Sequence, residues 1–268
     1  MPELPDLTVF SENLSKQYVG KKIGDVSVLR TKPVLPMPTN QFTALLQEKF
    51  FQRIERRGKQ LVFVIDDMNE LWVHLMLHGE IYALQPHESV PAASCVVIGF
   101  QDKTRLAFAD GTQWMKIKIR QPGQDPPAWA SKGMDPLSKG FTVEYLTRCA
   151  ATQRLGALKP FLMNQKLIGG IGNAFADEIL WDAHLAPTRL AAKLIPEELP
   201  RLHMSIRNVL SNAVQEVRKR SHGGFTGEIR DFLSVHVGKG KPCPRCTTPV
   251  HFALVKGRGT YWCPRCQV

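Results

Sequence analysis

The spacing of apolar residues changes along the chain and separates a strand-rich first part from a helical second part. One helix is expected at the start, behind Asp6 as a helix N-cap and ended by Gly20. Its apolar positions recur at helical spacing: Leu7, Phe10, Leu14 and Tyr18. Alternating segments then predict strands over residues 22–30, 51–65, 70–84, 94–100, 104–109 and 112–121. Such short strands with Gly and Asp turns favour an antiparallel sandwich or barrel.

The last of these segments carries one wholly basic face. Met115, Ile117 and Ile119 alternate with Lys116, Lys118 and Arg120. A solvated outer face of the sheet explains the basic triplet about as well as contact with DNA does.

The pattern becomes helical after a Pro- and Gly-rich break at residues 121–127. Spacings of three and four predict helices over residues 142–151, 158–166, 173–184 and 197–220. We therefore expect a multidomain α+β protein: a β-sandwich with its N-terminal helix (1–126), a linker (127–141), a helical domain (142–236) and a cysteine-rich hairpin (237–268).

A glycine-rich turn, Lys166–Asn173, lies between two of the expected helices. Glycines there permit positive φ and close backbone approach, and Asn173 opens the next helix. The N-terminus of that helix is expected to offer free amides and the positive end of its dipole to a phosphate. Many helical hairpins turn on glycine without binding anything, so the motif alone leaves DNA binding open.

Two Cys-x-x-Cys pairs close the chain, and they consist of Cys243, Cys246, Cys263 and Cys266. Four thiolates at this spacing predict one structural Zn²⁺ with a full ligand set, with two disulfides as the alternative. Residues 237–268 contain no Asp or Glu but several basic residues: Lys239, Lys241, Arg245, Lys256, Arg258 and Arg265. A metal-held hairpin of uniform positive charge is suited to phosphates, so nucleic acid is the expected partner.

Composition agrees with a polyanionic partner, although a basic enzyme of another kind would look similar. The formal net charge of the 268 residues is +11. The sequence shows neither a membrane-spanning apolar run nor a signal peptide at its start. Cys95 and Cys149 are isolated in apolar surroundings, as buried thiols are. We expect a cytoplasmic, reducing environment and no membrane partner.

Start, middle and end of the chain together resemble the formamidopyrimidine-DNA glycosylase/endonuclease VIII (Fpg/Nei) family. The residues that carry the resemblance are Pro2-Glu3-Leu4-Pro5, Arg57-Gly58-Lys59, His74-Leu75, Leu158–Met163, Gly170–Leu180 and the four cysteines. They span the whole chain in the family's order. The resemblance implies a β-sandwich, a helix–two-turn–helix domain and a zinc ribbon. It also implies base-excision repair of oxidised or ring-opened bases in double-stranded DNA by a monomeric glycosylase and AP lyase.

The resemblance gives the N-terminus a catalytic role, where the residues alone would suggest a disordered start. Removal of Met1 exposes the secondary amine of Pro2, a nucleophile towards sugar C1′ that forms a Schiff base. Glu3 is implied as the general acid/base, and Lys59 as the lysine that binds phosphate near the lesion and tunes the proline.

The same match implies DNA contacts elsewhere. Lys159 and Asn173 match phosphate-contacting positions, and Arg258 matches the zinc-finger arginine that grips the phosphates flanking the flipped nucleotide. A surface charge or a helix cap is the alternative for each of them.

Several positions depart from the family pattern. Leu77 stands where formamidopyrimidine enzymes place a wedge methionine, and Gln113 or Trp114 replaces an Arg-Phe pair. The loop that covers 8-oxoguanine in specialised members is missing between Phe232 and Val237. Asp6 replaces the usual glutamate. We therefore expect ring-opened purines, oxidised pyrimidines or abasic sites to be processed at least as well as 8-oxoguanine.

Two other classes of function are considered. A non-catalytic DNA-binding relative would have no need of Pro2, Glu3 and Lys59 together. A zinc-ribbon factor of transcription or translation leaves the N-terminus unexplained. The sequence thus favours a bifunctional DNA glycosylase and AP lyase.

Overall fold

The computed structural model describes residues 1–65, 69–153 and 156–268, and these form two compact units. The first unit comprises Met1–Pro2, Asp6–Ala130 and Arg220–Glu228. The second unit comprises Glu3–Pro5, Ser131–Lys219 and Ile229–Val268. The cysteine-rich end thus groups with the helical segment, while the domain boundaries expected from the sequence stay a prediction.

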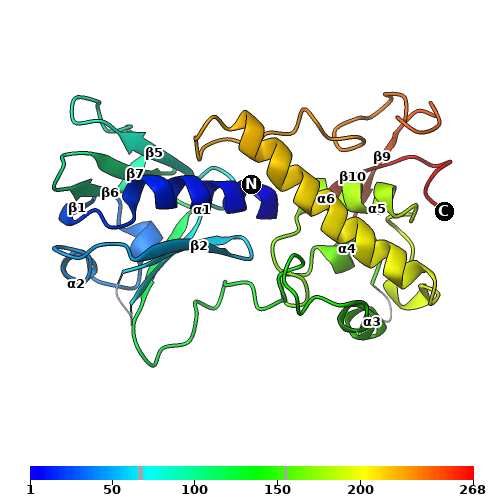
Figure 1. Ribbon diagram of the computed structural model, residues 1–268, viewed down its shortest axis with the longest axis horizontal. Coiled ribbons are helices and arrows are strands. Elements are labelled where there is room, and N and C mark those ends of the chain that lie inside the picture. The colour runs from blue at the N-terminus through cyan, green and yellow to red at the C-terminus, as the bar shows by residue number, and fades with distance from the viewer. Residues whose placement is uncertain (66–68, 154–155) are drawn as a thin grey trace. The chain divides into compact units, whose positions relative to one another are not determined.

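The first unit is the expected antiparallel β-sandwich (Figure 1). One sheet has the order β1-β6-β7-β5 and the other the order β2-β3-β4-β8. The strands of the first sheet are β1 (Ile23–Val28), β6 (Ser94–Phe100), β7 (Arg105–Ala109) and β5 (Glu80–Leu84). Those of the second are β2 (Arg53–Arg57), β3 (Gln60–Val64), β4 (Glu70–His74) and β8 (Lys116–Arg120). Every pair of neighbouring strands is antiparallel.

One apolar core joins the two sheets and helix α1 (Leu4–Tyr18). The four expected apolar positions of the helix all lie in this core. Phe63 packs at its centre, with ring centroids 5.1 Å from Phe51 and 5.8 Å from Phe108. The expectation that Asp6 is the N-cap is wrong, because the helix already begins at Leu4. Pro5 is tolerated there, since the first helical turn needs no intrahelical N–H donor.

Two segments expected as single strands, 51–65 and 70–84, each contain two strands joined by a turn. The strands β2 and β3 are neighbours in one sheet, whereas β4 and β5 belong to different sheets. Gly58, with φ of 61°, separates β2 from β3, so that Lys59 lies at a turn. Residues 75–79 separate β4 from β5, and the Gly79 N–H closes this turn on the Leu75 carbonyl at 2.9 Å. A Cβ on Gly79 would lie 2.3 Å from that oxygen, so only glycine fits. Short segments missed by the alternation are a 3₁₀ turn (Lys32–Val34) and α2 (Thr39–Ala44).

The second unit contains helices α3 (Val143–Ala151), α4 (Leu158–Leu162), α5 (Asn173–Asp182) and α6 (Glu198–Arg220), a 3₁₀ turn (Ala191–Lys193) and the hairpin β9 (His251–Val255)–β10 (Arg258–Trp262). The Thr142 hydroxyl caps α3 by accepting the Tyr145 N–H at 3.3 Å. Apolar residues recur along α6 at spacings of three and four and are buried except for the half-buried Val209: Leu199, Leu202, Ile206, Val209, Ala213 and Val217. β10 packs against α5 (Figure 1). No helix in the described ranges is long and apolar enough to cross a membrane.

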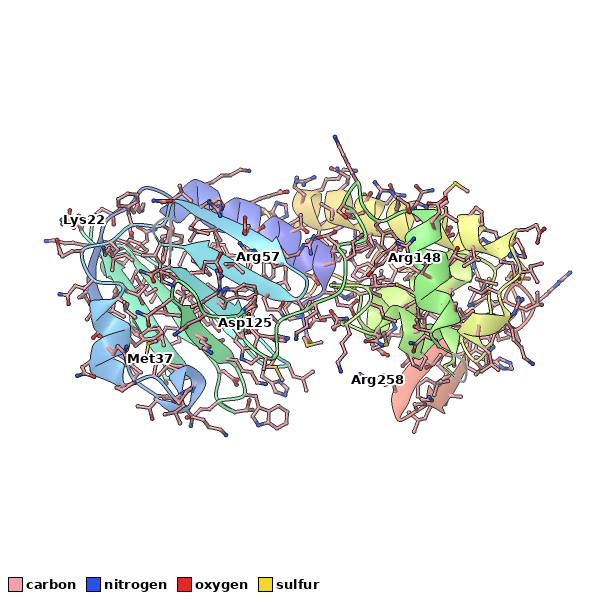
Figure 2. The ribbon with its side chains drawn as sticks, turned by 90° about the horizontal axis from the view of Figure 1, so that it is seen from below. Lys22, Met37, Arg57, Asp125, Arg148 and Arg258 are labelled. Atoms are coloured by element: carbon pink, nitrogen blue, oxygen red, sulfur yellow. The ribbon has the colours of Figure 1, made fainter. Side chains whose placement is uncertain are left out.

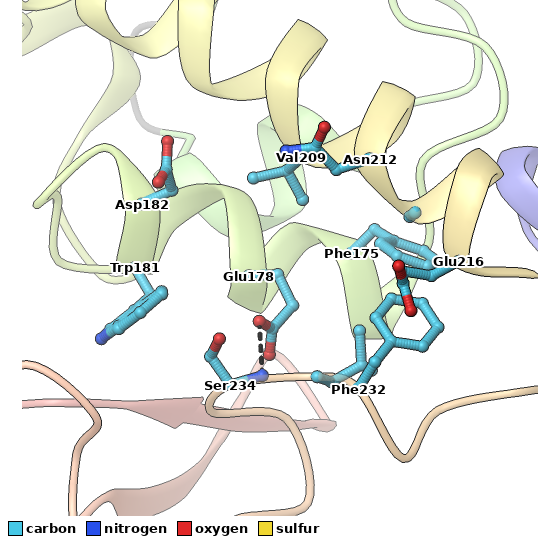
Figure 3. A pocket seen from close by; sticks show the side chains of 11 residues that line it. Phe175, Glu178, Trp181, Asp182, Val209, Asn212, Glu216, Phe232 and Ser234 are labelled. Atoms are coloured by element: carbon cyan, nitrogen blue, oxygen red, sulfur yellow. Dashed lines mark hydrogen bonds between the residues drawn. The ribbon is translucent and has the colours of Figure 1, made fainter.

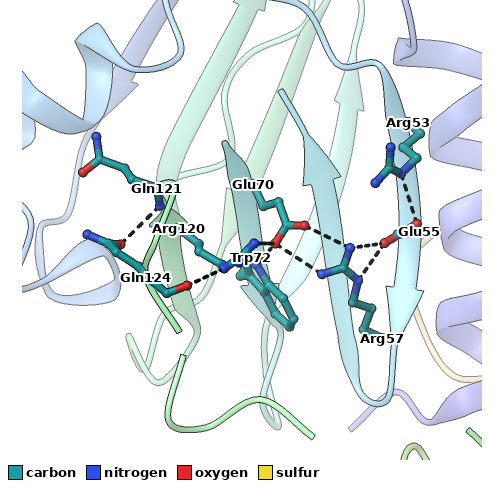
Figure 4. A network of polar contacts seen from close by, with 8 residues as sticks. All are labelled: Arg53, Glu55, Arg57, Glu70, Trp72, Arg120, Gln121 and Gln124. Atoms are coloured by element: carbon teal, nitrogen blue, oxygen red, sulfur yellow. Dashed lines mark hydrogen bonds and ion pairs between the residues drawn. The ribbon is translucent and has the colours of Figure 1, made fainter. Parts of the chain in front are cut away.

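A polar network covers the outer face of the second sheet (Figure 4). The buried Glu70 carboxylate accepts two hydrogen bonds from Arg57 at 2.9 and 3.2 Å and one from Trp72 Nε1 at 2.9 Å. Arg120 adds a third partner at 3.1 Å. One residue of the expected basic face is thereby paired within the protein. Burial raises the pKa of Glu70, but its bonds to Arg57, Trp72 and Arg120 outweigh burial and lower it overall.

We predict that Glu70→Gln lowers the free energy of unfolding by about 1–3 kcal/mol at neutral pH, because two buried arginine contacts lose their charged acceptor. The depressed pKa stabilises the fold above the ordinary glutamate value, and this stabilisation is lost as pH falls through the folded value. Thermal unfolding should therefore show the parent–variant gap closing as the pH falls below the ordinary glutamate pKa. Glu55→Gln, which removes a more exposed partner of Arg57, should cost about 0–1 kcal/mol. Equal losses in the two variants would contradict the assignment.

Candidate active site and nucleic-acid interface

Glu3 is buried and its carboxylate caps the N-terminus of α5. Oε2 accepts the N–H groups of Gly172 at 2.6 Å and Phe175 at 3.4 Å, and Oε1 accepts that of Ala174 at 2.9 Å. The Leu4 N–H adds a bond to the Gly170 carbonyl at 3.0 Å. The N-terminal segment is thus bound in place by the glycine-rich turn, and it is not a disordered start.

This geometry corrects the expectation that the same helix end offers free amides to a phosphate. Those amides are already occupied by Glu3, which is itself the anion at the positive end of the helix dipole. The glycine-rich turn thus binds a catalytic candidate of this chain through the Gly172 amide.

Pro2 is buried in the first unit and lines a cavity of about 280 Å³. The turn that carries Leu77 and the segment Gly227–Glu228 line the same cavity. Met1, which precedes Pro2, pairs through its terminal ammonium with the Glu228 carboxylate. The structure therefore brings the candidate nucleophile and the candidate wedge residue to one cavity.

Lys59 is buried at the β2–β3 turn, and its charge acts on His74 of β4. Burial, then the charges of Lys59 and Lys116, lower the pKa of His74 to about 4. The imidazole is therefore neutral at physiological pH, and its Nδ1 accepts the Met76 N–H at 3.0 Å. His74 holds the start of the turn on which Leu77 lies, with Leu77 53% exposed.

A second exposed tip is formed by Gln113 and Trp114, and the buried Asp110 carboxylate holds it. Oδ2 accepts the N–H groups of Trp114 at 2.8 Å and Met115 at 2.7 Å, while Oδ1 binds Thr112. Gln113 has a positive φ of 55°. Trp114 is 50% exposed, and its ring lies 6.2 Å from that of His78. The two candidate wedge segments therefore meet within the first unit.

Lys159 and Asn173 both bind the carbonyl of Gly259 in the second unit. The distances are 2.7 Å from Lys159 Nζ and 3.0 Å from Asn173 Nδ2. The Lys159 side chain is 1% exposed and forms an ion pair of 2.7 Å with Asp177. The pKa of Lys159 is lowered overall, because burial lowers it more than the neighbouring Asp177 carboxylate raises it. The Lys159 ammonium is thus held between Asp177 and the Gly259 carbonyl, and its contact with phosphate stays a prediction.

Arg258 precedes that doubly bound Gly259 and is exposed at the start of β10 (Figure 2). Lys256 and Gly257 form the turn of the hairpin with φ of 48° and 75°. Lys159 and Asn173 therefore fix the backbone next to the arginine expected to grip phosphate.

The four cysteines of the two Cys-x-x-Cys motifs form one cluster, with all four Sγ atoms within 4.8 Å of one another. Cys246 Sγ lies 3.4 Å from Cys263 Sγ, and Cys243 Sγ lies 3.9 Å from Cys266 Sγ. All four are free thiols, which rules out the disulfide alternative in this structure. A tetrahedral zinc with bonds of about 2.3 Å needs sulfurs about 3.8 Å apart, so the cluster suits a metal ion. Trp181 of α5 donates to Cys243 Sγ at 3.4 Å.

Residues 232–236, which follow α6 and are called the short loop below, are bound to α5 by Glu178 (Figure 3). Its buried carboxylate accepts the N–H groups of Ser234, Val235 and His236, each at 2.8 Å. The pKa of Glu178 is raised overall, because burial raises it more than these three hydrogen bonds lower it. His236 Nδ1 lies 2.8 Å from Asp177. A cavity of about 300 Å³ remains between α5, α6 and residues 232–234.

Sequence reasoning missed four acidic residues that hold these parts together: Asp110, Asp177, Glu178 and Glu228. Asp177 and Glu178 lie inside the motif that carried the family resemblance, so their position was visible although their role was not. Asp110 binds groups of Thr112, Trp114 and Met115, which follow it closely in the chain, so its role as a turn former was open to sequence reasoning. Glu228 pairs with a terminus that only the fold brings near.

Comparison with known proteins agrees with this geometry. The formamidopyrimidine-DNA glycosylase N-terminal domain matches residues 1–117, and the formamidopyrimidine-DNA glycosylase H2TH domain matches residues 132–222. The formamidopyrimidine-DNA glycosylase of Symbiobacterium thermophilum is 36% identical, over 100% of this chain and 89% of that protein.

Solved structures of the Lactococcus lactis Fpg are similar throughout. Its complex with abasic-site DNA has a TM-score of 0.89 at 30% identity, over 99% of both chains. Its complex with FAPY-dG DNA has a TM-score of 0.90 at 29% identity, again over 99% of both. The fold and site are those of a DNA glycosylase. The chain belongs to the formamidopyrimidine-DNA glycosylase family.

Proposed function

We propose that this protein is a base-excision DNA glycosylase with AP lyase activity that acts on double-stranded DNA containing damaged bases. The observation that carries the proposal is the ordered N-terminus: Pro2 lines a cavity, and the next residue, Glu3, has its carboxylate fixed by three amides. A non-catalytic relative would have no use for this arrangement.

The chemistry begins at the Pro2 nitrogen after Met1 has been removed. The nitrogen bonds to sugar C1′ while the bond from C1′ to the damaged base breaks, and the departing base takes up a proton from water. As the sugar ring opens, Glu3 takes the proton from the nitrogen and delivers it to the ring oxygen, which leaves an iminium. The iminium acidifies C2′, and loss of a C2′ proton expels the 3′ phosphate.

Lys59 supplies positive charge in the same unit as Pro2. Lys59 lies at the β2–β3 turn, and the resemblance gives its ammonium the phosphate near the lesion. The neutral His74 adds no competing charge beside it.

Arg258 is the direct phosphate ligand of the hairpin in this proposal. Lys159 and Asn173 act through the Gly259 carbonyl and hold Arg258 in place. This assigns Lys159 a positioning role instead of the phosphate contact that the resemblance implies, because the side chain is enclosed and paired with Asp177.

One structural Zn²⁺ would be held by Cys243, Cys246, Cys263 and Cys266. The ion would close the base of the β9–β10 hairpin and takes no part in the chemistry, because four thiolates leave no open position. Thiolate ligands and the unpaired, buried Cys95 and Cys149 suit a reducing intracellular compartment, where the DNA substrate is found.

The lesion class follows from the short loop after α6. Glu178 and Asp177 bind residues 234–236 to α5, so in this proposal the loop does not fold over a flipped base. Ring-opened purines, oxidised pyrimidines and abasic sites depend less on such a cover than 8-oxoguanine does. The similar Lactococcus lactis enzyme has been captured with FAPY-dG and with abasic DNA.

We predict that borohydride traps a covalent adduct between the protein and an abasic-site duplex, and that the adduct maps to the N-terminal peptide beginning at Pro2. Pro2→Gly should weaken trapping, since a primary amine replaces the ring nitrogen. Extra residues before Pro2 should abolish it. Normal cleavage of abasic DNA by the extended protein would refute the mechanism. Glu3→Gln should lose base excision at least 100-fold, the usual size of an acid/base contribution.

We predict one zinc per chain by elemental analysis, and loss of both zinc and DNA binding in Cys246→Ser. Arg258→Ala should keep the zinc, weaken DNA binding, and reduce the slope of log affinity against log salt by about one unit. Arg265→Ala, which changes a basic residue inside the second Cys-x-x-Cys pair, is the matched control for charge. Zinc-free protein with full activity would overturn the metal assignment.

We predict that single-turnover excision is at least as fast on formamidopyrimidine and dihydrothymine as on 8-oxoguanine, whichever base lies opposite. Loss of the covering loop removes backbone contacts to the purine, and the replacement of an arginine wedge by Gln113 and Trp114 relaxes recognition of the opposite base. A clear preference for 8-oxoguanine paired with cytosine would show that this loop does not set specificity.

A further inference from the structure

The cavity beside Pro2 contains two carboxylates that differ in their partners. Glu80 accepts the hydroxyl of Tyr82, whereas Glu228 pairs with the terminal ammonium of the chain. Both residues line the cavity together with Pro2 and the turn 77–79. Glu228 therefore faces the N-terminal amine, while Glu80 is turned towards another side chain.

Removal of Met1 transfers the terminal amine to Pro2 without moving it out of this cavity, because Pro2 itself lines the wall. The titratable groups that line the cavity are His78, Glu80 and Glu228, and Glu3 follows Pro2 in the chain. Glu228 forms an ion pair with the chain's terminal ammonium.

We propose that Glu228 is the counter-ion of the Pro2 amine, and that it stabilises the cationic iminium during catalysis; this inference rests on the proposed Schiff-base function. A neutral amine becomes a permanent cation when the iminium forms, and a carboxylate held beside the nitrogen favours that charged state. Glu228 takes no atom from the substrate. It lies in the segment Arg220–Glu228, which returns from the end of α6 to the first unit.

The same carboxylate also sets the pH at which the enzyme begins to react. A carboxylate beside an amine favours the protonated amine, which is not nucleophilic. Glu228 therefore delays attack at low pH and stabilises the product of attack at higher pH. Loss of the carboxylate should therefore let attack begin at a lower pH and also reduce the amount of adduct formed at higher pH. A general loss of folding would reduce adduct formation at every pH.

The test compares Glu228→Gln with Glu80→Gln, a matched loss of one carboxylate from the same cavity. Borohydride trapping on an abasic-site duplex is measured against pH, with binding to a tetrahydrofuran duplex as the non-covalent control. In Glu228→Gln we expect half-maximal trapping about one pH unit lower. We also expect about 3–10-fold less adduct at the plateau, with unchanged binding. Both differences should shrink in high salt, because the pair is partly exposed. Glu80→Gln should keep the parent profile.

Glu228→Asp should restore most of the plateau and the parent midpoint, because the charge returns on a shorter side chain. If Glu228→Gln fails to fold, the parent itself decides: a midpoint that falls as salt rises supports the counter-ion, and a midpoint independent of salt rejects it. A parent protein that forms no adduct refutes the proposed function itself. A parent that traps normally beside a Glu228→Gln variant with the parent profile refutes only the role of Glu228.

Discussion

The contact between the Glu3 carboxylate and the N-terminus of α5 is the interaction on which the candidate site depends. Three backbone amides bind one side chain, so the third residue of the chain is ordered as firmly as a core residue. Such bonds to an ionised acceptor are stronger than neutral ones. A terminus is ordinarily mobile, and a mobile amine would be a poor nucleophile because each attack would require it to be ordered first.

Acidic side chains perform the same task at three further places in this basic protein. Asp110 ties down the tip that carries Gln113 and Trp114, Glu178 ties the short loop to α5, and Asp177 pairs with Lys159. Asp110 and Glu178 suit this role because each accepts several N–H groups that irregular backbone would otherwise leave unsatisfied. Asp177 acts on side chains instead. These buried acids therefore organise irregular segments of a chain whose net charge is +11.

Sequence pattern predicted the elements best where burial is one-sided. The α1 stripe from Leu7 to Tyr18, the β8 alternation and the long stripe of α6 follow directly from which side meets the core. It failed where a turn is made by sterics and not by polarity. The segment 70–84 alternates continuously, yet it turns at residues 75–79, where Gly79 alone fits under the Leu75 carbonyl. The motifs identified Pro2, Glu3 and the cysteines, but not what each one contacts.

By itself the sequence predicted the short strands, the helical segment and the four-cysteine cluster, because periodicity and ligand spacing are local properties of the chain. The choice of a sandwich over a barrel, and the family, came from the resemblance that its motifs carry. Only the tertiary structure decided which anion occupies the α5 N-terminus, since Glu3 and Gly172 are far apart in sequence. It likewise decided that Lys159 is enclosed against Asp177 and that Glu228 meets the terminal ammonium. Pairings of this kind depend on where folding brings distant charges together, and neither composition nor spacing encodes that position.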